Sequence, residues 1–459
     1  MRPPLLSAGS PASDIFNQND QEEPVAAEPE VRPVHAEPLG WDPLLVCLAG
    51  YILVVVGRIH QLFSGLEALH PATLTGLFAI ALYAMDRRDD RRLRLVICPV
   101  TKILFALLVW MVLSTPGALV PGSSFDVVFG NFIKTVLMYV VVVGSLRGIR
   151  DVERLAAVYL IAATTYSVIV ISRFDLGEGD AWRLGHLYYY DANDFATFAV
   201  TAMPFGLYLL HAGRRGLTRL MAVVSLMVLT LAFVRTGSRG GFIALIAVAA
   251  FIVWRYTGVP LRWRVAVTVL VGLVVLGAAS DQYWTQMGTI LSDADYNRTD
   301  ESGRMQIWRR GLGYMLSNPI LGVGPGNFQA AEGMLSPFAT RQQFGIGVRW
   351  NAAHNSYIQV GAELGIPGLC MFVGVIGGAF AALRRVRRSE IDNEQEGEDG
   401  QDEADRHGAF RQALMASLIG FVVGAYFLSL AYTEMLYVLV ALAVGLEKVT
   451  ALSRGASLT

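Results

Sequence analysis

Long apolar blocks recur along this 459-residue chain and limit what it can fold into. Most of them run for about 16 to 22 residues, which is enough, or nearly enough, for a helix to cross about 30 Å of hydrocarbon. Apolar residues make up 54% of the chain and charged residues only 16%, a composition that excludes an ordinary soluble enzyme. The sequence therefore predicts an all-α polytopic membrane protein.

The apolar blocks predict about twelve transmembrane helices. They lie near residues 42–57, 71–85, 95–114, 126–144, 153–172, 191–211, 218–235, 240–256, 265–281, 354–383, 409–430 and 432–450. Five short loops between them hold twenty arginines, and all five loops fall on one side of the membrane if the count of twelve is right. The positive-inside rule places that side, with both termini, in the cytoplasm.

The remaining segments divide the chain further. The first of them is rich in proline and acidic residues, which predicts disorder, and a late acidic stretch predicts a flexible loop. The expected divisions are a disordered cytoplasmic tail at 1–40, helices 1–9 within 41–281, an outer loop domain at 282–353, helix 10 at 354–383, a flexible acidic cytoplasmic loop at 384–408, and helices 11–12 with a cytoplasmic tail at 409–459.

One outer loop carries an arginine and an aromatic run just before a span. Asp191 or Asn193 can cap the helix that follows, because their side-chain oxygens accept hydrogen bonds from unpaired backbone N–H groups. Tyr188–Tyr190 predict an interfacial aromatic belt, although such rings can also stack on sugars. Arg183 is a candidate anion ligand, since arginines are in the minority on the outer side.

Two more arginines, Arg235 and Arg239, flank a turn between the seventh and eighth spans, with Ser238 beside them. If this turn is helical, the two arginines are i, i+4 neighbours and repel one another. Placing both near lipid is costly, which favours a shared anionic ligand. The alternative is that both side chains extend to phospholipid headgroups.

The outer segment at 282–353 contains an amphipathic pattern. Its apolar residues recur at helical spacing between Met305 and Leu316, with arginines on other faces, which predicts a helix lying on the membrane surface. Asn318 and Pro319 end that helix. The glycine-rich run at 322–328 predicts a turn in preference to a phosphate-binding loop, because no strand–helix unit surrounds it. Arg349 is a secondary candidate for the site.

His354 opens the tenth span, where water meets the membrane. On a continuous helix, Tyr357, Gly361 and Gly365 would lie on or near its face. Gly361 and Gly365 form a pair of small residues that lets another helix approach closely, so the stretch can also be explained as a packing seam.

His354 and Asn355, followed after nine residues by Gly365-Ile-Pro-Gly368, resemble the signature of the bacterial O-antigen ligase and polymerase superfamily. Arg183, the Ser238-Arg239 pair and the glycine-rich run look like further segments of this family. The resemblance implies a metal-independent, inverting glycosyltransferase without a cofactor. Its donor would be a glycan on undecaprenyl diphosphate, presented at the periplasmic face of the bacterial inner membrane, and 282–353 would be a periplasmic loop domain.

The resemblance also implies roles for individual residues. Arg239 and Arg183 would bind the diphosphate, with Arg235 and Arg349 as weaker candidates, and His354 would take the proton of the acceptor hydroxyl. The expected supporting residues are Ser238, Asn193, Asn355 and Tyr357. His186 is a rival base, and the spacing of Glu363 puts it out of phase with His354, so the residue that orients this histidine is not identified.

Several functions stay open. Within the family, the acceptor is lipid A-core for a ligase of lipopolysaccharide synthesis, a growing glycan for a polymerase of exopolysaccharide or O-antigen, or a protein. A twelve-span secondary transporter is the alternative of a different class, although no six-plus-six repeat is visible. No basic stripe with interleaved aromatic residues is present, which excludes a nucleic-acid partner.

Overall fold

The computed structural model describes residues 40–173, 183–184, 190–213, 215–291, 300–345, 347, 349–394 and 401–453. Across these residues the regular structure is helical and contains no strand. The predicted all-α class is therefore confirmed.

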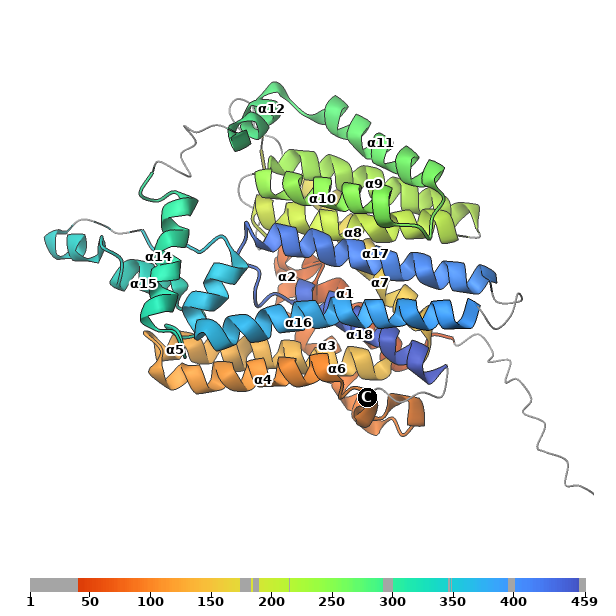
Figure 1. Ribbon diagram of the computed structural model, residues 1–459, viewed down its shortest axis with the longest axis horizontal. Helices are drawn as coiled ribbons and strands as arrows, with labels where there is room; N and C mark the ends of the chain where they lie inside the picture. The colour runs from red at the N-terminus through yellow and green to blue at the C-terminus, as the bar shows by residue number, and fades with distance from the viewer. Residues whose placement is uncertain are drawn as a thin grey trace, which may run out of the picture. The chain divides into compact units, whose positions relative to one another are not determined.

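Every predicted span coincides with a helix (Figure 1). These helices are α1 (Pro43–Val55), α3 (Pro71–Met85), α4 (Pro99–Ser114), α6 (Ile133–Ser145) with α5 (Pro121–Phe125) and the π-helical η5 (Asp126–Phe132) before it, α7 (Ile149–Arg173), α8 (Ala192–Ala212), α9 (Gly216–Thr236), α10 (Arg239–Arg255), α11 (Leu261–Ala278), α16 (Ser356–Glu394), α17 (Gln401–Ala425) and α18 (Glu434–Leu452). The shorter elements are η1 (Ile59–Leu62), α2 (Ser64–Glu67), η2 (Asp89–Arg91), η3 (Leu93–Leu95), η4 (Thr115–Gly117), α12 (Asp281–Gly288), η6 (Thr289–Leu291), α14 (Arg304–Ser317), α15 (Phe328–Met334) and η7 (Ala339–Phe344).

Within the described part of the chain, ten helical stretches are long and apolar enough to cross a membrane. The two predicted spans that fall short of this length are α1, with 13 residues, and α10, with 17. The structure is thus that of a polytopic membrane protein, as the apolar blocks predict.

Helices far apart in the sequence pack side by side. α17 packs against α8 and α10, α16 packs against α4 and α18, and α18 packs against α6 (Figure 1). Small residues permit these approaches: a Cβ atom on Gly424 of α17 would lie 2.5 Å from the hydroxyl oxygen of Thr197 on α8. The late helices α16–α18 therefore pack among the early ones and do not form a separate layer.

Arginines of the first two basic loops meet at one end of the helices. The Arg91 side chain is 2% exposed; it bonds to the Ser145 carbonyl oxygen at 2.9 Å and to Asp86 at 2.5 Å, and it pairs with Asp42. Arg147 also pairs with Asp42, at 3.2 Å. These ion pairs tie the α3–α4 loop and the α6–α7 loop to the start of α1.

A buried lysine closes α6 at the same end. The Lys448 ammonium of α18 donates to the carbonyl oxygens of Val143, Gly144 and Leu146 at 3.2, 2.8 and 3.0 Å. Carbonyl oxygens at the C-terminus of a helix lack partners within the helix and carry partial negative charge, so a cation there stabilises the helix end.

α16 is interrupted at Gly365, whose φ of 69° and ψ of −170° are not helical. The glycine-rich run uses this break: the N–H groups of Val323 and Gly324 donate to the carbonyl oxygens of Ala362 and Glu363 at 2.9 and 3.0 Å. A Cβ atom on Gly365 would lie 2.3 Å from the Ile320 carbonyl oxygen, so only glycine fits there.

The two glycines predicted to admit a helix therefore act differently. Gly361 lets helix α14 approach closely, since a Cβ atom on Gly361 would lie 2.7 Å from the sulfur of Met315 on α14. At Gly365 the expectation was wrong, because the backbone of Pro319 and Ile320, which follow α14, approaches instead of a helix.

α14 confirms the predicted helix and its end at Asn318. Met305, Leu312 and Leu316 are 50%, 43% and 62% exposed and share one face. This open apolar stripe is what a helix lying on a membrane surface requires.

Candidate active site at the start of α16

His354 lies in the turn that precedes α16 and has a left-handed backbone, with φ of 46°. The Asn355 side chain caps the helix by accepting from the N–H groups of Tyr357 and Ile358 at 2.9 and 3.0 Å. Because the helix begins only at Ser356, His354 does not share a helical face with the residues after it, and that expectation was wrong. A left-handed non-glycine residue costs roughly 1–3 kcal/mol and is often found at functional sites.

The turn between α17 and α18 holds His354 in place. The His354 N–H donates to the Ser429 hydroxyl at 3.0 Å. Next to it, the Ser356 hydroxyl donates to the Leu428 carbonyl oxygen at 2.7 Å and accepts from the Leu430 N–H at 2.8 Å. The position of His354 is therefore fixed by three successive residues of a segment 75 residues further along the chain.

Burial lowers the pKa of the His354 imidazole below its ordinary value of 6.5, and the positive charge of Arg304 lowers it further. The Asp191 carboxylate acts in the opposite direction. Arg304 begins α14 and Asp191 precedes α8, so two distant segments set the charge around this ring. The lowered pKa favours the neutral imidazole, the form that can accept a proton.

Arg183 is bound to the turn between α9 and α10. Its Nε donates to the Thr236 carbonyl oxygen at 2.6 Å and its Nη2 donates to Asn193 Oδ1 at 3.0 Å. Of the two possible caps of α8, Asp191 is the one used, since its carboxylate accepts from the N–H groups of Asn193 and Asp194 at 2.7 and 2.8 Å. Asn193 instead uses its side-chain oxygen to hold Arg183.

Arg235 and Arg239 belong to different helices. α9 ends at Thr236, and Gly237 then turns the chain with a left-handed φ of 56°. Ser238 caps α10 by accepting from the Gly241 N–H at 3.1 Å, and Arg239 is the first residue of α10. The expected i, i+4 relationship was therefore wrong, because the helix does not continue through the turn.

Arg239 and His354 border the same turn. Arg239 is partly buried and donates from Nη1 to the Thr289 hydroxyl at 2.7 Å. A Cβ atom on the neighbouring Gly240 would lie 2.7 Å from Cβ of Phe427, two residues before Ser429. The start of α10 thus packs on the α17–α18 turn that holds His354.

The other predicted site residues occupy varied positions. Arg235 and Arg349 are exposed. The Tyr357 hydroxyl donates to the Val422 carbonyl oxygen at 3.0 Å and so joins α16 to α17. His186, Tyr188 and Tyr189 lie outside the described residues.

Tyr190 belongs to the core and not to an interfacial belt, so that expectation was wrong for this tyrosine. It is 4% exposed, and its hydroxyl donates to the Val56 carbonyl oxygen at 2.8 Å. Its ring packs against Tyr166 at a centroid distance of 5.5 Å. An aromatic run before a helix looks the same in sequence whether its rings face the interface or the protein interior.

The glycine-rich run is a turn closed by a carboxylate of the chain itself. The N–H groups of Gly326 and Phe328 donate to the Glu363 carboxylate at 3.0 and 3.1 Å, and the Tyr432 hydroxyl donates to it at 2.8 Å. Glu363 fills the place that a phosphate would take, which agrees with the turn interpretation. The Glu363 carboxylate is thus bound by these groups and not by His354. This agrees with the prediction that the spacing of Glu363 puts it out of phase with His354.

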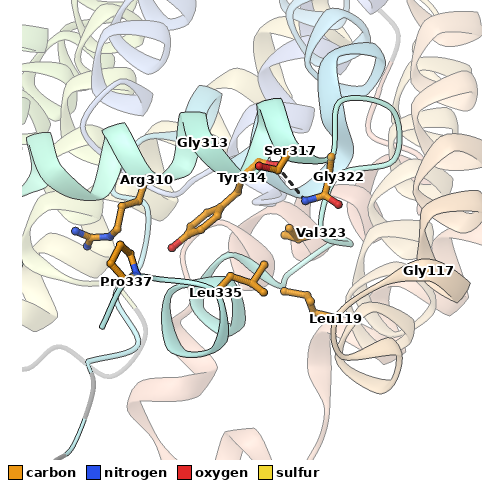
Figure 2. A pocket seen from close by; sticks show the side chains of 11 residues that line it. Gly117, Leu119, Arg310, Gly313, Tyr314, Ser317, Gly322, Val323, Leu335 and Pro337 are labelled. Atoms are coloured by element: carbon orange, nitrogen blue, oxygen red, sulfur yellow. Dashed lines mark hydrogen bonds between the residues drawn. The ribbon is translucent and has the colours of Figure 1, made fainter. Parts of the chain in front are cut away.

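A cavity of about 570 Å³ lies between α14 and the glycine-rich run (Figure 2). Its lining includes Gly117, Leu119, Arg310, Gly313, Tyr314, Ser317, Asn318, Gly322, Val323, Leu335 and Pro337. The predicted site residues do not appear in this lining. Arg310 and the Tyr314 hydroxyl both bind the buried Glu332, at 2.5 and 2.8 Å, which makes one wall of the cavity rigid.

Sequence reasoning missed several residues around His354. Arg304 was assigned only to the polar face of a surface helix, and Ser429 lies in a short turn between two apolar spans where no motif marks it. Trp308 falls within the apolar pattern between Met305 and Leu316, but its indole N–H donates to the Ala353 carbonyl oxygen at 2.9 Å, directly before His354. These are contacts through space, for which the sequence carries no local signal.

Comparison with known families identifies part of the chain. A family model described as O-antigen ligase matches residues 222–373, from α9 to the first half of α16. No curated protein matches the chain. The matched range includes Ser238, Arg239, Arg349 and His354, whereas Arg183 and Asn193 precede it. Residues 222–373, about a third of the chain, are therefore similar to the O-antigen ligase family.

Proposed function

We propose that this protein transfers a glycan from a polyprenyl-diphosphate-linked donor to an acceptor hydroxyl at the end of the helices where His354 lies. At the level of the family it is a membrane enzyme of glycan transfer. The observation that carries the finer proposal is the position of His354, which Ser429 fixes in a turn bordered by the start of α10 and where burial lowers the pKa of the imidazole.

In the proposed reaction, His354 accepts the proton of the acceptor hydroxyl as its oxygen attacks the anomeric carbon of the donor. The new glycosidic C–O bond forms while the bond from that carbon to the diphosphate oxygen breaks. The bonding electrons leave with the diphosphate, so polyprenyl diphosphate is released and the anomeric centre inverts.

Arg239 is the proposed principal ligand of the diphosphate. A guanidinium binds phosphate oxygens through paired N–H donors and offsets the negative charge that grows on the leaving group. Arg183 is proposed as a second ligand that also holds the turn leading to Arg239, through its bond to Thr236. The exposed Arg235 and Arg349 are proposed as outer ligands of the same lipid diphosphate.

The proposed orientation puts the arginine-rich end, where Arg91 and Arg147 lie, in the cytoplasm and His354 on the periplasmic side of the bacterial inner membrane. The lipid diphosphate is itself the leaving group, so no nucleotide is needed on that side. The family description supports a ligase, whose acceptor would be lipid A-core. A polymerase of repeat units is the second candidate, because the superfamily includes both.

The test uses cells in which this gene is replaced by variants. His354→Ala and Arg239→Ala should accumulate the lipid-linked glycan and lose the glycan-modified acceptor, with transfer falling about 10²–10⁴-fold when a general base is lost. His70→Ala is a matched control, because His70 is an exposed histidine that also has a left-handed φ, of 44°. Arg255→Ala is the control at the other end of α10. Wild-type transfer by His354→Ala would overturn the proposal.

A further inference from the structure

An open pair of aromatic rings lies beside His354. Tyr426 directly follows α17, and Trp308 belongs to α14. Their ring centroids are 5.2 Å apart at an interplanar angle of 76°, an edge-to-face contact. Tyr426 is 48% exposed, so a large part of this ring is free to contact a ligand.

Both rings are fixed relative to His354. The Trp308 indole N–H bonds to the carbonyl oxygen of Ala353, the residue before His354. Tyr426 lies in the turn whose Ser429 accepts from the His354 N–H, and its ring also contacts Tyr357 at 6.5 Å. The Ala353 carbonyl oxygen and the His354 N–H belong to the same peptide unit. Its two hydrogen bonds therefore connect the proposed base to Trp308 and to the turn that carries Tyr426.

Two adjacent residues of the α17–α18 turn contact different helices. Phe427 packs against Gly240, next to Arg239, whereas its neighbour Tyr426 packs against Trp308. The rings of Tyr426 and Phe427 are at 79° to one another and extend toward α14 and α10 respectively. The turn therefore contacts the start of α10 through Phe427 and contacts α14 through Tyr426.

We propose that Tyr426 and Trp308 form a subsite for a saccharide, which takes the acceptor glycan beside His354. A pyranose ring has hydroxyl groups at its edge and C–H groups on its faces, and these C–H groups fit the electron-rich face of an aromatic ring. Direct displacement requires the acceptor and the diphosphate on opposite sides of the anomeric carbon. The diphosphate is assigned to Arg239 at the start of α10, and the aromatic pair, which contacts α14 and is held next to His354, is assigned to the acceptor. The assignment to the acceptor rests on the proposed function.

The alternative explanation is an interfacial belt residue that only contacts lipid headgroups. Trp254, which is 77% exposed in the last turn of α10, represents such a belt residue. It lies at the opposite end of α10 from Arg239. The two explanations differ in what they predict for saccharide binding. Replacing a belt residue leaves the affinity for a saccharide unchanged, whereas replacing the ring of a sugar platform lowers that affinity.

Binding is measured on the full chain in lipid nanodiscs, with delipidated core oligosaccharide of lipopolysaccharide as the probe. Tyr426→Leu keeps apolar bulk without the ring and should raise the dissociation constant about five- to tenfold, whereas Tyr426→Phe should stay within about twofold of the wild type. Trp254→Leu is the matched control and should bind as the wild type does. Equal binding by Tyr426→Leu and the wild type, or no saturable binding by the wild type, overturns the proposal.

A transfer assay separates this proposal from the proposed function. Tyr426→Leu should raise KM for the acceptor about as much as it raises the dissociation constant, with kcat nearly retained. If the wild type transfers no glycan but binds the probe through Tyr426, the proposed function fails and the subsite stands. If transfer proceeds and Tyr426→Leu changes neither constant, the subsite fails and the function stands.

Discussion

Nε of Arg183 donates a hydrogen bond of 2.6 Å to the carbonyl oxygen of Thr236, the last residue of α9. Three residues later the chain reaches Arg239. A carbonyl oxygen at the end of a helix has no partner within the helix, so this bond fixes the direction in which the chain leaves α9. Arg183 therefore acts on Arg239 through the backbone as well as through its own charge.

We expect Arg183→Lys to lower kcat/KM for the donor about tenfold or more. A lysine keeps the charge but lacks the planar guanidinium group, whose N–H groups bond to both Thr236 and Asn193. Asn193→Ala should cost less, since it removes one of these two hydrogen bonds. Initial rates in nanodiscs measure both variants, with Arg255→Lys as the control. A fully active Arg183→Lys enzyme would show that only charge matters at this position.

The pH profile of kcat/KM should have its acidic limb below 6.5, the ordinary pKa of histidine. Burial and the charge of Arg304 lower the pKa of His354, so the ring stays neutral to lower pH and activity is lost only as pH falls through the lowered pKa. Arg304→Gln removes one of these causes and should move the limb to higher pH. Arg309→Gln, on the exposed face of the same helix, should leave the limb in place. The assignment of His354 as base is contradicted if both variants share the wild-type profile.

Gly324→Ala should destabilise the protein strongly. Gly324 has φ of 100°, and a Cβ atom there would lie 2.2 Å from Cβ of Ala118. The control is Gly313→Ala in α14, where a Cβ atom meets nothing within 4 Å. Alanine favours a helix interior over glycine by roughly 0.5–1 kcal/mol, so this control should be neutral or stabilising. Thermal unfolding in detergent measures both, and equal midpoints would contradict the described turn.

Glu363→Ala should also lower the unfolding temperature. It leaves the N–H groups of Gly326 and Phe328 and the hydroxyl of Tyr432 without their acceptor, and each unpaired buried donor costs about 1–3 kcal/mol. Tyr432→Phe removes the hydroxyl itself, so no unpaired donor is left behind. This variant should therefore lower the unfolding temperature less than Glu363→Ala does. A milder effect of Glu363→Ala than of Tyr432→Phe would show that the carboxylate does not hold the glycine-rich run.

The positions of the membrane helices could be predicted because the thickness of a bilayer fixes the length of an apolar block. Capping could be predicted in the same local way, as at Asp191, because a cap depends on residues two or three positions apart. The break in α16 could not. Gly361 and Gly365 have the spacing of a helix-packing pair, and although Pro367 weakens the helix locally, the backbone that approaches Gly365 belongs to a segment far away in the sequence.

The candidate site was predictable as a set of residue types but not as an arrangement. Histidine and arginine at the edges of apolar blocks are unusual enough to be noticed. The sequence could not show that Arg183 binds the turn after α9, or that Ser429 holds His354, because these pairs are 53 and 75 residues apart. Nor could it show that Trp308 and Tyr426 meet beside the histidine.

The break at Gly365 has a consequence for how the chain is assembled. Between Val323 and Phe328 the backbone is held by carbonyl oxygens and a carboxylate that belong to α16. Cut free from the membrane helices, this stretch would lose the groups that shape it, and it should not fold as a soluble fragment. During synthesis it leaves the ribosome before the helix on which it depends, so its final shape is acquired only after that helix has been inserted.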